Sequence, residues 1–393
     1  MKKVIILGGG PAGCAAAHQI GMLDGYDVTI IEKTSLIGGG CLTKFFGGHP
    51  YTFGPRHFLT DKPYLYEFLK KYVPMRSCGE HEFKTYIESE DEFYNYPLIE
   101  TDIQRMPDVD KITEERKNAK GAEGQKNLQD YWLNTVGPTL FKKFIHDYNK
   151  KMWHIDDLTE IDDFAWAPRG PSIGSGKEKV FSDRISAYPT NYNGYNDYFP
   201  IATEKAKVLL NYKLDKFDIL KKEFVIDGDK KKFDIVVNTL SPDFLFNYEL
   251  GELPYSGIDF HPFVLPIENA FPKDVYFLYY ATLKNKIKRC VEYKKLTRYK
   301  SKNTLLGIEV PSLNNKLYPL PVKKHKDLAS RYHDLMPEGV YSIGRAGVYK
   351  YGIDFDRCID HGMIVAKDLK STGGGKGSVL KIDPSGEQHR VAK

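Results

Sequence analysis

The chain has 393 residues, of which 41% are hydrophobic and 28% charged, and its formal net charge is +5. These are ordinary values for a globular protein, and no apolar run approaches the roughly 18 residues that a membrane-spanning helix needs. The length favours a nucleotide-binding core with an inserted or appended substrate region. Five scattered cysteines without C-x-x-C spacing indicate neither a zinc site nor a disulfide framework, which fits a reducing, cytoplasmic setting. The mild positive charge suits an anionic ligand and equally suits an unremarkable surface.

The first expected elements are a strand, a tight turn and a helix. A short β-branched run at 4–7 leads into G-G-G-P-A-G at 8–13, which has the G-x-G-x-x-G spacing of dinucleotide-binding proteins. Gly8 would allow the turn, Gly10 would let backbone approach a pyrophosphate, and Gly13 would let the helix pack closely on the strand. The cofactor-binding residues predicted here are Gly8, Gly10, Pro11, Ala12 and Gly13.

Two further glycine elements extend this site. The second strand, at 28–31, ends in Glu32, where a carboxylate can accept the ribose hydroxyls of an adenine dinucleotide. Three glycines follow at 38–40, and a strand and glycine turn at 340–347 lead to a helix at about 356–369. This arrangement resembles FAD-binding oxidoreductases, in which an acidic residue is followed by a second glycine pair beside the flavin. The further cofactor-binding residues predicted here are Glu32, Lys33, Gly39, Gly40, Gly344 and Arg345.

The middle of the chain shows no catalytic motif. Its histidines lack H-E-x-x-H spacing, and no G-x-S-x-G elbow is present. The hard chemistry therefore belongs to the flavin, and no metal is expected. Aromatic residues at helical spacing predict a helical region that includes 127–152, and segments rich in Tyr, Phe, Val and Ile predict sheet at about 80–98 and 255–320.

Several blocks of the chain resemble the UDP-galactopyranose mutases. D-Y-N-K-K-M-W at 147–153 is similar to the family's G-Y-T-R-K-Q-W, and the block 344–356 resembles G-R-L-G-x-Y-x-Y-x-D-M-D with about one extra residue. The first match implies that Tyr148 stacks on uracil and that Trp153 lies on a mobile lid loop, although an aromatic core face of a helix would show similar residues. The second match implies that Arg345 meets the flavin.

Other matches imply contacts with a substrate. K-R-C-V-E-Y-K resembles Y-T-R-I-x-E-x-K and makes Arg289 a diphosphate-binding arginine, whereas we interpret most of the basic stretch 284–302 as a solvated strand face. L-Y-P-L-P resembles Y-Y-P-V and assigns the hydroxyl of Tyr318 to the diphosphate. The terminal block assigns Tyr351 to the substrate phosphates or sugar, and also to the cofactor site. Asp354 would order the site, although capping the following helix would alone explain it.

Three departures from the family pattern fall on positions that serve the flavin or the phosphates. Arg56 stands where the family has a histidine beside the flavin ring, unless His57 takes that place. Arg169 is the only arginine of the lid pattern that is kept. Ile185 replaces a phosphate-binding tyrosine, for which Arg184 is a candidate substitute.

The resemblance implies a reaction without a protein nucleophile. In this family the reduced flavin of FAD attacks the anomeric carbon through N5, and a flavin–sugar adduct forms as UDP departs. Ring opening and reclosure then exchange the pyranose for the furanose form, as in galactofuranose supply for cell-surface polysaccharides. The catalytic candidates are Arg289, Arg169, Tyr318, Tyr351 and Asp354, and the substrate-binding candidates are Tyr148, Trp153, Tyr195 and Arg184.

The implied partners are a nucleotide sugar, UDP-linked in the family, and an external reductant such as NAD(P)H or a flavin reductase. A homodimer is a candidate assembly, and no nucleic acid is expected. Two other readings use the same glycine elements. One is an amine-oxidase-like or desaturase-like FAD oxidoreductase that acts on a small molecule, and the other is a non-catalytic FAD-binding homologue.

The predicted fold class is α/β, with a discontinuous Rossmann-like FAD-binding domain, a helical insert and a mostly antiparallel sheet in the substrate domain. The FAD-binding domain would comprise 1–75, 200–245 and 335–370. The helical substrate and lid insert would comprise 100–180, and the sheet region 76–99 and 246–334. The glycine-rich, polar segment 371–393 is expected to be a disordered tail.

Overall fold

The computed structural model describes residues 1–393 except 165–169, 177–179, 182, 373–379, 383–387 and 391–393. Near the N-terminus lies a five-stranded parallel sheet with the strand order β10-β2-β1-β14-β20. Three distant stretches of sequence therefore build one sheet, which confirms the discontinuous nucleotide-binding unit of the predicted fold class. In the order of the sheet, its strands are Ala206–Leu209, Tyr26–Ile31, Lys2–Leu7, Ile235–Asn238 and Val340–Ser342.

Both faces of this sheet are covered, which explains the uninterrupted apolar run of β1. Val4 and Ile6 belong to the core that includes α1, α8 and α13, whereas Ile5 and Leu7 belong to the core on the other face, with residues of α9 and α11. Alternate side chains of a strand point to opposite faces, so the run is buried on both sides. The helices named here are α1 (Pro11–Gly21), α8 (Tyr198–Thr203), α9 (Pro242–Leu245), α11 (Lys323–Asp334) and α13 (Phe355–Thr372).

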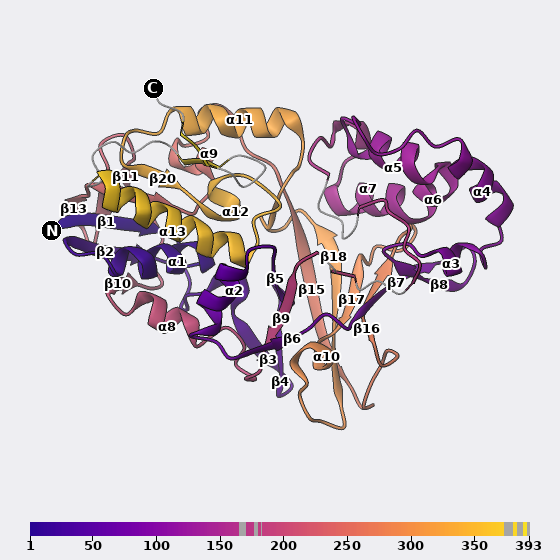
Figure 1. The fold of residues 1–393 in the computed structure, drawn as a ribbon. Coiled ribbons are helices and arrows are strands. Elements are labelled where there is room, and N and C mark those ends of the chain that lie inside the picture. Colours follow the sequence, from indigo (N-terminus) through magenta and orange to yellow (C-terminus); the bar gives the residue numbers. More distant parts are fainter. Residues whose placement is uncertain (165–169, 177–179, 182, 373–379, 383–387, 391–393) are drawn as a thin grey trace.

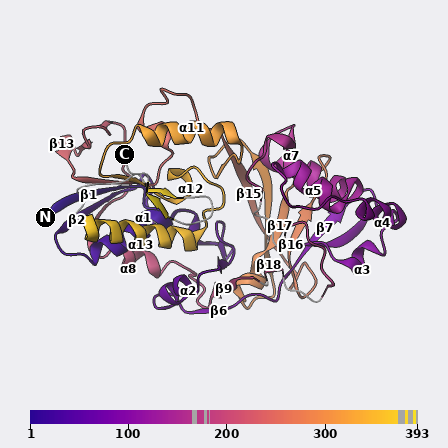
Figure 2. The same ribbon diagram turned by 45° about the horizontal axis from the view of Figure 1, so that its top comes forward.

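Helices α1 and α13 lie side by side on one face of the sheet (Figures 1 and 2). Small residues make this approach feasible, since a Cβ added to Gly362 would lie 2.7 Å from the backbone of Ala15. Helix α1 begins at Pro11, because proline is well suited to the first turn of a helix. A segment near the N-terminus and the distant segment 355–372 therefore meet beside the sheet.

A second sheet has seven strands in the order β19-β15-β18-β17-β16-β7-β8, and it is antiparallel except where β7 pairs with β16. It is the mostly antiparallel sheet of the predicted fold class. Figure 1 shows it between the nucleotide-binding part and the helical insert. Its strands are β7 (Glu82–Ile87), β8 (Glu92–Tyr96), β15 (Tyr255–Leu265), β16 (Val275–Tyr280), β17 (Arg289–Glu292), β18 (Thr304–Ser312) and β19 (Tyr318–Pro319).

The helical insert follows β8 and lies at the far end of the molecule from the N-terminus (Figure 1). The region 127–152 is helical but is broken at Gly137, whose φ of +86° no helix interior adopts, and Pro138 then starts a new helix. The elements of the insert are α3 (Glu100–Ile103), α4 (Val109–Lys117), α5 (Leu128–Val136), α6 (Pro138–Leu140), a π-helix (Phe141–His146), α7 (Asp147–Trp153) and a 3₁₀ turn (Leu158–Glu160).

None of the described helices is long and apolar enough to cross a membrane. Short elements connect the three parts of the fold. They are a 3₁₀ turn (Gly39–Cys41), β3 (Thr43–Phe46), β4 (His49–Thr52), β5 (Phe58–Thr60), α2 (Pro63–Lys70), β6 (Met75–Ser77), β9 (Ile185–Pro189), β11 (Phe217–Asp218), β12 (Glu223–Ile226), β13 (Asp229–Lys232), α10 (Tyr293–Thr297) and α12 (Gly344–Gly347).

The tail differs from expectation. Where the sequence predicted disorder over 371–393, α13 continues to Thr372, and β21 (Leu380–Ile382) pairs antiparallel with β22 (Gln388–Arg390). These two strands hydrogen-bond to each other through their backbones.

Candidate functional site

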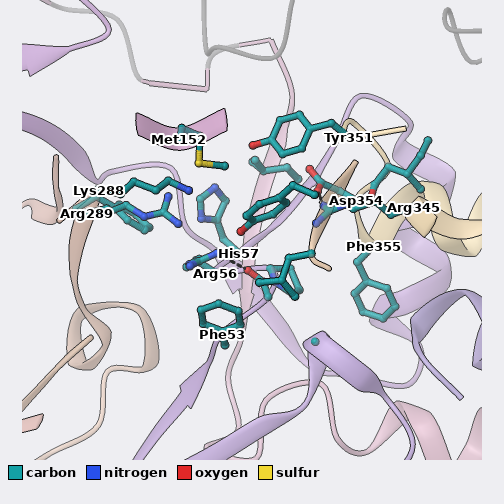
Figure 3. Close-up of a pocket in the computed structure, with 18 of the residues that line it drawn as sticks. Phe53, Arg56, His57, Met152, Lys288, Arg289, Arg345, Tyr351, Asp354 and Phe355 are labelled. Atoms are coloured by element: carbon teal, nitrogen blue, oxygen red, sulfur yellow. Dashed lines mark hydrogen bonds and ion pairs between the residues drawn. The ribbon is translucent and has the colours of Figure 1, made fainter. Parts of the chain in front are cut away.

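A cavity of about 540 Å³ lies where the nucleotide-binding sheet, the seven-stranded sheet and the helical insert meet. One wall comes from the loops after β1 and β20, and the other from β16, β17 and α7. Figure 3 shows cationic side chains on one side of this cavity and the residues around Arg345 on the other. Of the predicted cofactor residues, those that line it are Gly10, Pro11, Ala12, Gly40, Arg56, His57, Gly344, Arg345 and Tyr351.

The glycines at the cofactor end differ in what they leave room for. A Cβ on Gly13 would lie 2.0 Å from the carbonyl oxygen of Gly8, so this glycine serves the packing of the protein itself. A Cβ on Gly10 would meet nothing within 4 Å, and the φ of −72° at Gly10 suits any residue. The protein therefore has no use of its own for glycine at position 10, whereas a dinucleotide passing close to the backbone does.

The three glycine elements meet at one place. Gly38 donates its backbone N–H to the carbonyl oxygen of Gly9 at 2.7 Å, which joins the second element to the first. A Cβ on Gly344 would lie 2.7 Å from the Cβ of Ala12, so the third element also touches the first. The backbone N–H of Gly344 is held by Nδ1 of the buried His361 at 3.0 Å. These contacts make a continuous backbone cradle.

Glu32 ends β2 and ties the cradle to that strand. Its carboxylate accepts the backbone N–H of Gly9 at 2.8 Å and the N–H of Thr34 at 2.8 Å. A carboxylate has lone pairs for further donors, so Glu32 keeps the capacity to accept ribose hydroxyls. Glu32 and Lys33 lie outside the cavity lining, and Lys33 is exposed.

His57 offers buried polar atoms to this cavity. Both of its ring nitrogens are buried and have no hydrogen-bond partner among the residues that the structure describes. Burial, followed by the neighbouring His81 and Arg56, lowers the pKa of His57 well below its usual value, so the ring is neutral. A buried, neutral imidazole without a partner is suited to a hydrogen bond with a bound cofactor. The imidazole of His57 is therefore compatible with an FAD bound in the cradle.

Arg345 and Asp354 form an ion pair at the opposite side of the cavity. Arg345 donates from Nη2 to Asp354 at 2.7 Å and from Nε to the carbonyl oxygen of Ile353 at 3.1 Å. The guanidinium also lies 5.5 Å from the ring centre of Tyr318 and 5.8 Å from that of Tyr351. The carbonyl oxygen of Asp354 accepts the backbone N–H of Cys358 in α13 at 3.0 Å, so the residue serves both the helix start and the site.

A buried charge cluster occupies the other side. The carboxylate of Glu309 has no exposed surface and forms ion pairs with Arg289, at 2.8 Å, and with Arg56. Burial alone would raise the pKa of Glu309, but Arg289, Arg56 and Lys288 together lower it to about 2. Lys288 is only 4% exposed, which corrects the interpretation of 284–302 as a solvated strand face. The reason is that Lys288 precedes β17 at the cavity, where its side chain points inward (Figure 3).

Tyrosines and two tryptophans, Trp132 and Trp153, line the cavity on the side of the insert. Tyr148, which the resemblance assigns to stacking on the base, lines the cavity. It lies edge-on to Tyr279, with ring centres 5.9 Å apart. The expectation that Trp153 lies on a lid loop is wrong, since Trp153 ends α7 and is 1% exposed. Its ring packs at 87° against Tyr351, and its indole N–H donates to Asn149 at 3.3 Å, so packing fixes it.

Two other candidates, Tyr195 and Arg184, have no clear role in the structure. Tyr195 is fully buried in the core beside Phe355, with ring centres 5.3 Å apart, and it does not line the cavity, which contradicts its prediction as a substrate contact. The turn at Gly194 directs it inward. Arg184 lines the cavity but pairs with Asp183 at 2.7 Å. Arg169 lies outside the described residues.

Comparison with known proteins identifies the family. The family model described as UDP-galactopyranose mutase matches residues 143–351, more than half of the chain. The chain belongs to the UDP-galactopyranose mutase family. A model described as an NAD(P)-binding Rossmann-like domain matches residues 6–72, which agrees with the parallel sheet and its glycine loop.

Relatives of this chain match it over nearly its whole length. The dTDP-fucopyranose mutase of Escherichia coli is 25% identical over 381 residues, which cover 91% of this chain and 96% of that protein. A crystal structure of reduced UDP-galactopyranose mutase matches with a TM-score of 0.80 at 15% identity, covering 95% and 98% of the two chains. A putative protoporphyrinogen oxidase from Exiguobacterium sp. 255-15 matches with a TM-score of 0.69 at 14% identity, covering 94% and 99%. These two structures show the shared fold.

Sequence reasoning about this mutase-family site overlooked three residues, Lys288, Glu309 and His361. Glu309 carries no motif, and only the pairing of β17 with β18 places it opposite Arg289. Lys288 was indistinguishable from the exposed lysines around it. His361 lies within α13, where the spacing from Gly344 gives no signal.

Proposed function

We propose that this protein is an FAD-dependent mutase that interconverts the pyranose and furanose forms of a hexose linked to a pyrimidine nucleoside diphosphate. The cavity carries the proposal, because it joins a dinucleotide cradle to a cationic, tyrosine-lined chamber. Membership of the family and the likeness to dTDP-fucopyranose mutase support a sugar nucleotide as the substrate. We place dTDP-fucopyranose first among the substrates to test and UDP-galactopyranose second.

The thiols around the cavity do not suit nucleophilic catalysis by the protein. Two thiols line it, those of Cys41 and Cys358. Burial raises the pKa of Cys358 to about 12 and that of Cys41 well above its usual value, so both stay protonated at neutral pH. When bound and reduced, the flavin supplies the nucleophile for the anomeric carbon.

The protein's own part is to hold and neutralise the diphosphate. Arg289 and Arg345 approach the cavity from opposite walls. Tyr318 and Tyr351 also line it, with ring centres 5.5 Å and 5.8 Å from the guanidinium of Arg345. Fixed donors of this kind stabilise the charge that develops as a diphosphate departs, and they do so without reorganising at the moment of reaction. Tyr148 offers a flat ring for the base. The products keep the oxidation state of the substrate, so an external reductant is needed only to maintain the reduced cofactor.

The test is conversion by the purified flavoprotein. We would incubate the dithionite-reduced and the oxidised protein with dTDP-fucopyranose, UDP-galactopyranose and ADP-glucose, and separate the products by ion-exchange chromatography with NMR of any new peak. A furanose product from the reduced protein alone is the expected result. If FAD is retained but no sugar nucleotide is converted, and a small substrate bleaches the oxidised flavin instead, the protein is a hydride-transferring oxidoreductase and the proposal fails.

A further inference from the structure

Lys288 presents a buried ammonium group to the cavity without a hydrogen-bond partner. Its side chain is 5% exposed, and its Nζ donates no hydrogen bond to any residue that the structure describes. The nearest carboxylate oxygen, Oε2 of Glu309, lies 3.9 Å away, beyond hydrogen-bond distance. A buried charge without hydrogen bonds is costly, so a position of this kind calls for a ligand.

Glu309 cannot satisfy this ammonium, because the arginines already occupy it. Arg289 donates to both carboxylate oxygens, at 3.0 Å and 2.8 Å from Nη2, and Arg56 donates to Oε1. The cluster thus holds the cations Arg56, Lys288 and Arg289 around one carboxylate. This surplus of positive charge at a cavity wall matches a dianionic group.

The position of Lys288 indicates which kind of anion would bind to its ammonium group. Its Nζ lies 5.3 Å from the ring centre of Tyr318, and the guanidinium of Arg345 lies 5.5 Å from the same ring centre. Figure 3 shows Lys288 entering the cavity alongside Arg289, opposite Arg345. Cations that converge from two walls suit a group with several charged oxygens, such as a diphosphate, better than a single hydroxyl.

We propose that Lys288 is a substrate-binding residue that donates a charge-assisted hydrogen bond to the diphosphate of the nucleotide sugar. This assignment rests on the proposed function and adds a contact to it. The segment K-R-C-V-E-Y-K carries this lysine where the pattern Y-T-R-I-x-E-x-K, which it resembles, has a threonine.

The electrostatics of the site add a second readout. Burial, followed by Arg289, lowers the pKa of Lys288 well below its usual value, and Arg56 and Arg345 act in the same direction, whereas Glu309 opposes them. A bound dianion raises that pKa again, so binding takes up a proton. The affinity for a nucleoside diphosphate should therefore fall as the pH rises, and the proton uptake should depend on Lys288.

The experiment is calorimetric titration of the oxidised flavoprotein with dTDP, UDP and thymidine, in two buffers of different ionisation enthalpy. Lys288→Met keeps the length of the side chain and suits a buried site, so the variant should fold with its full FAD content. We expect its affinity for dTDP and UDP to fall about 10- to 100-fold, with thymidine binding unchanged and the proton uptake lost. Lys286→Met, which removes an exposed lysine two residues earlier, is the matched control and should bind as the wild type does.

The outcomes separate the two proposals. If Lys288→Met retains FAD and binds dTDP and UDP as tightly as the wild type, the assignment of Lys288 is wrong and the proposed function stands. If the wild type binds neither nucleoside diphosphate, both fail. If the wild type binds dTDP and loses this binding in Lys288→Met, but converts no sugar nucleotide, then the mutase function fails and the diphosphate contact remains.

Discussion

Arg289 and Glu309 face each other as direct partners across β17 and β18, and the guanidinium donates to both carboxylate oxygens. The same carboxylate holds Arg56, which comes from the loop before β5. One residue therefore fixes two arginines that arrive from different parts of the chain, and it sets the direction in which both face the cavity.

Removing this carboxylate charge should destabilise the protein. In Glu309→Gln three buried cations lose the one acidic partner that they have among the described residues, and breaking a buried ion pair in this way costs about 3 kcal/mol or more. Urea unfolding followed by circular dichroism measures the loss. Glu252→Gln breaks an exposed pair with Lys316 and should change stability by less than about 0.5 kcal/mol. Equal stability of the two variants would contradict the role given to Glu309.

Two glycine variants should fail in different ways. Gly10→Ala puts a methyl group where the protein leaves open space, so the variant should fold normally but retain FAD at least about tenfold more weakly. Gly13→Ala drives a methyl group into the carbonyl of Gly8 and should lower stability by about 2 kcal/mol or more. The ratio of flavin to protein absorbance tests the first variant, and thermal unfolding with excess FAD tests the second. Full FAD retention by Gly10→Ala would refute the proposed path of the cofactor.

Lys151 should act as a structural clamp between α7 and the loop from β16 to β17. Its ammonium donates to carbonyl oxygens of that loop at 2.7–2.9 Å, those of Tyr280, Thr282, Asn285 and Ile287. Lys151→Met leaves these acceptors without their donor and should cost about 2 to 3 kcal/mol. Lys150→Met, one residue earlier, is the control, and a similar loss in both variants during urea unfolding would argue against the clamp.

Stability should depend on pH through His361. Burial lowers the pKa of His361 to about 4, whereas in the unfolded chain it is about 6.5. Between these values the unfolded chain binds more protons, so this contribution is complete above about pH 6.5 and is lost as the pH falls towards 4, by up to about 3 kcal/mol. His361→Asn keeps an acceptor for the N–H of Gly344 but does not titrate. Its urea midpoint should vary less between pH 4 and 7 than that of the wild type, and identical profiles would contradict this account.

Local geometry made the cofactor end predictable. The roles expected for Gly8 and Gly13 follow from contacts within one strand, one turn and one helix, and the structure shows these contacts. The fold class followed for a similar reason, since the apolar run at 4–7 and the glycines at 38–40 and 344 each define their own short element.

The substrate end depends on contacts that no local pattern records. Glu309 meets Arg289 only through the register of two strands, and Lys288 is buried only because the strand edge there borders a cavity. For Trp153 and Tyr195 the error was the reverse, because the sequence predicted a role at the substrate for residues that pack in the protein. Aromatic residues serve equally well in a core and at a ligand, and tertiary packing placed Tyr195 in the core and made Trp153 the buried end of a helix.

The closing of the nucleotide-binding sheet by β20 and the packing of α13 against α1 have a consequence for the order of events during synthesis. A nascent chain that has not reached Val340 lacks an outer strand of the sheet, the glycine turn at 344 and the helix that covers the alanine face of α1. Domains generally fold as units. We therefore expect flavin loading to follow the synthesis of Val340 and the residues after it, and a shorter nascent chain to leave the alanine face of α1 uncovered by α13.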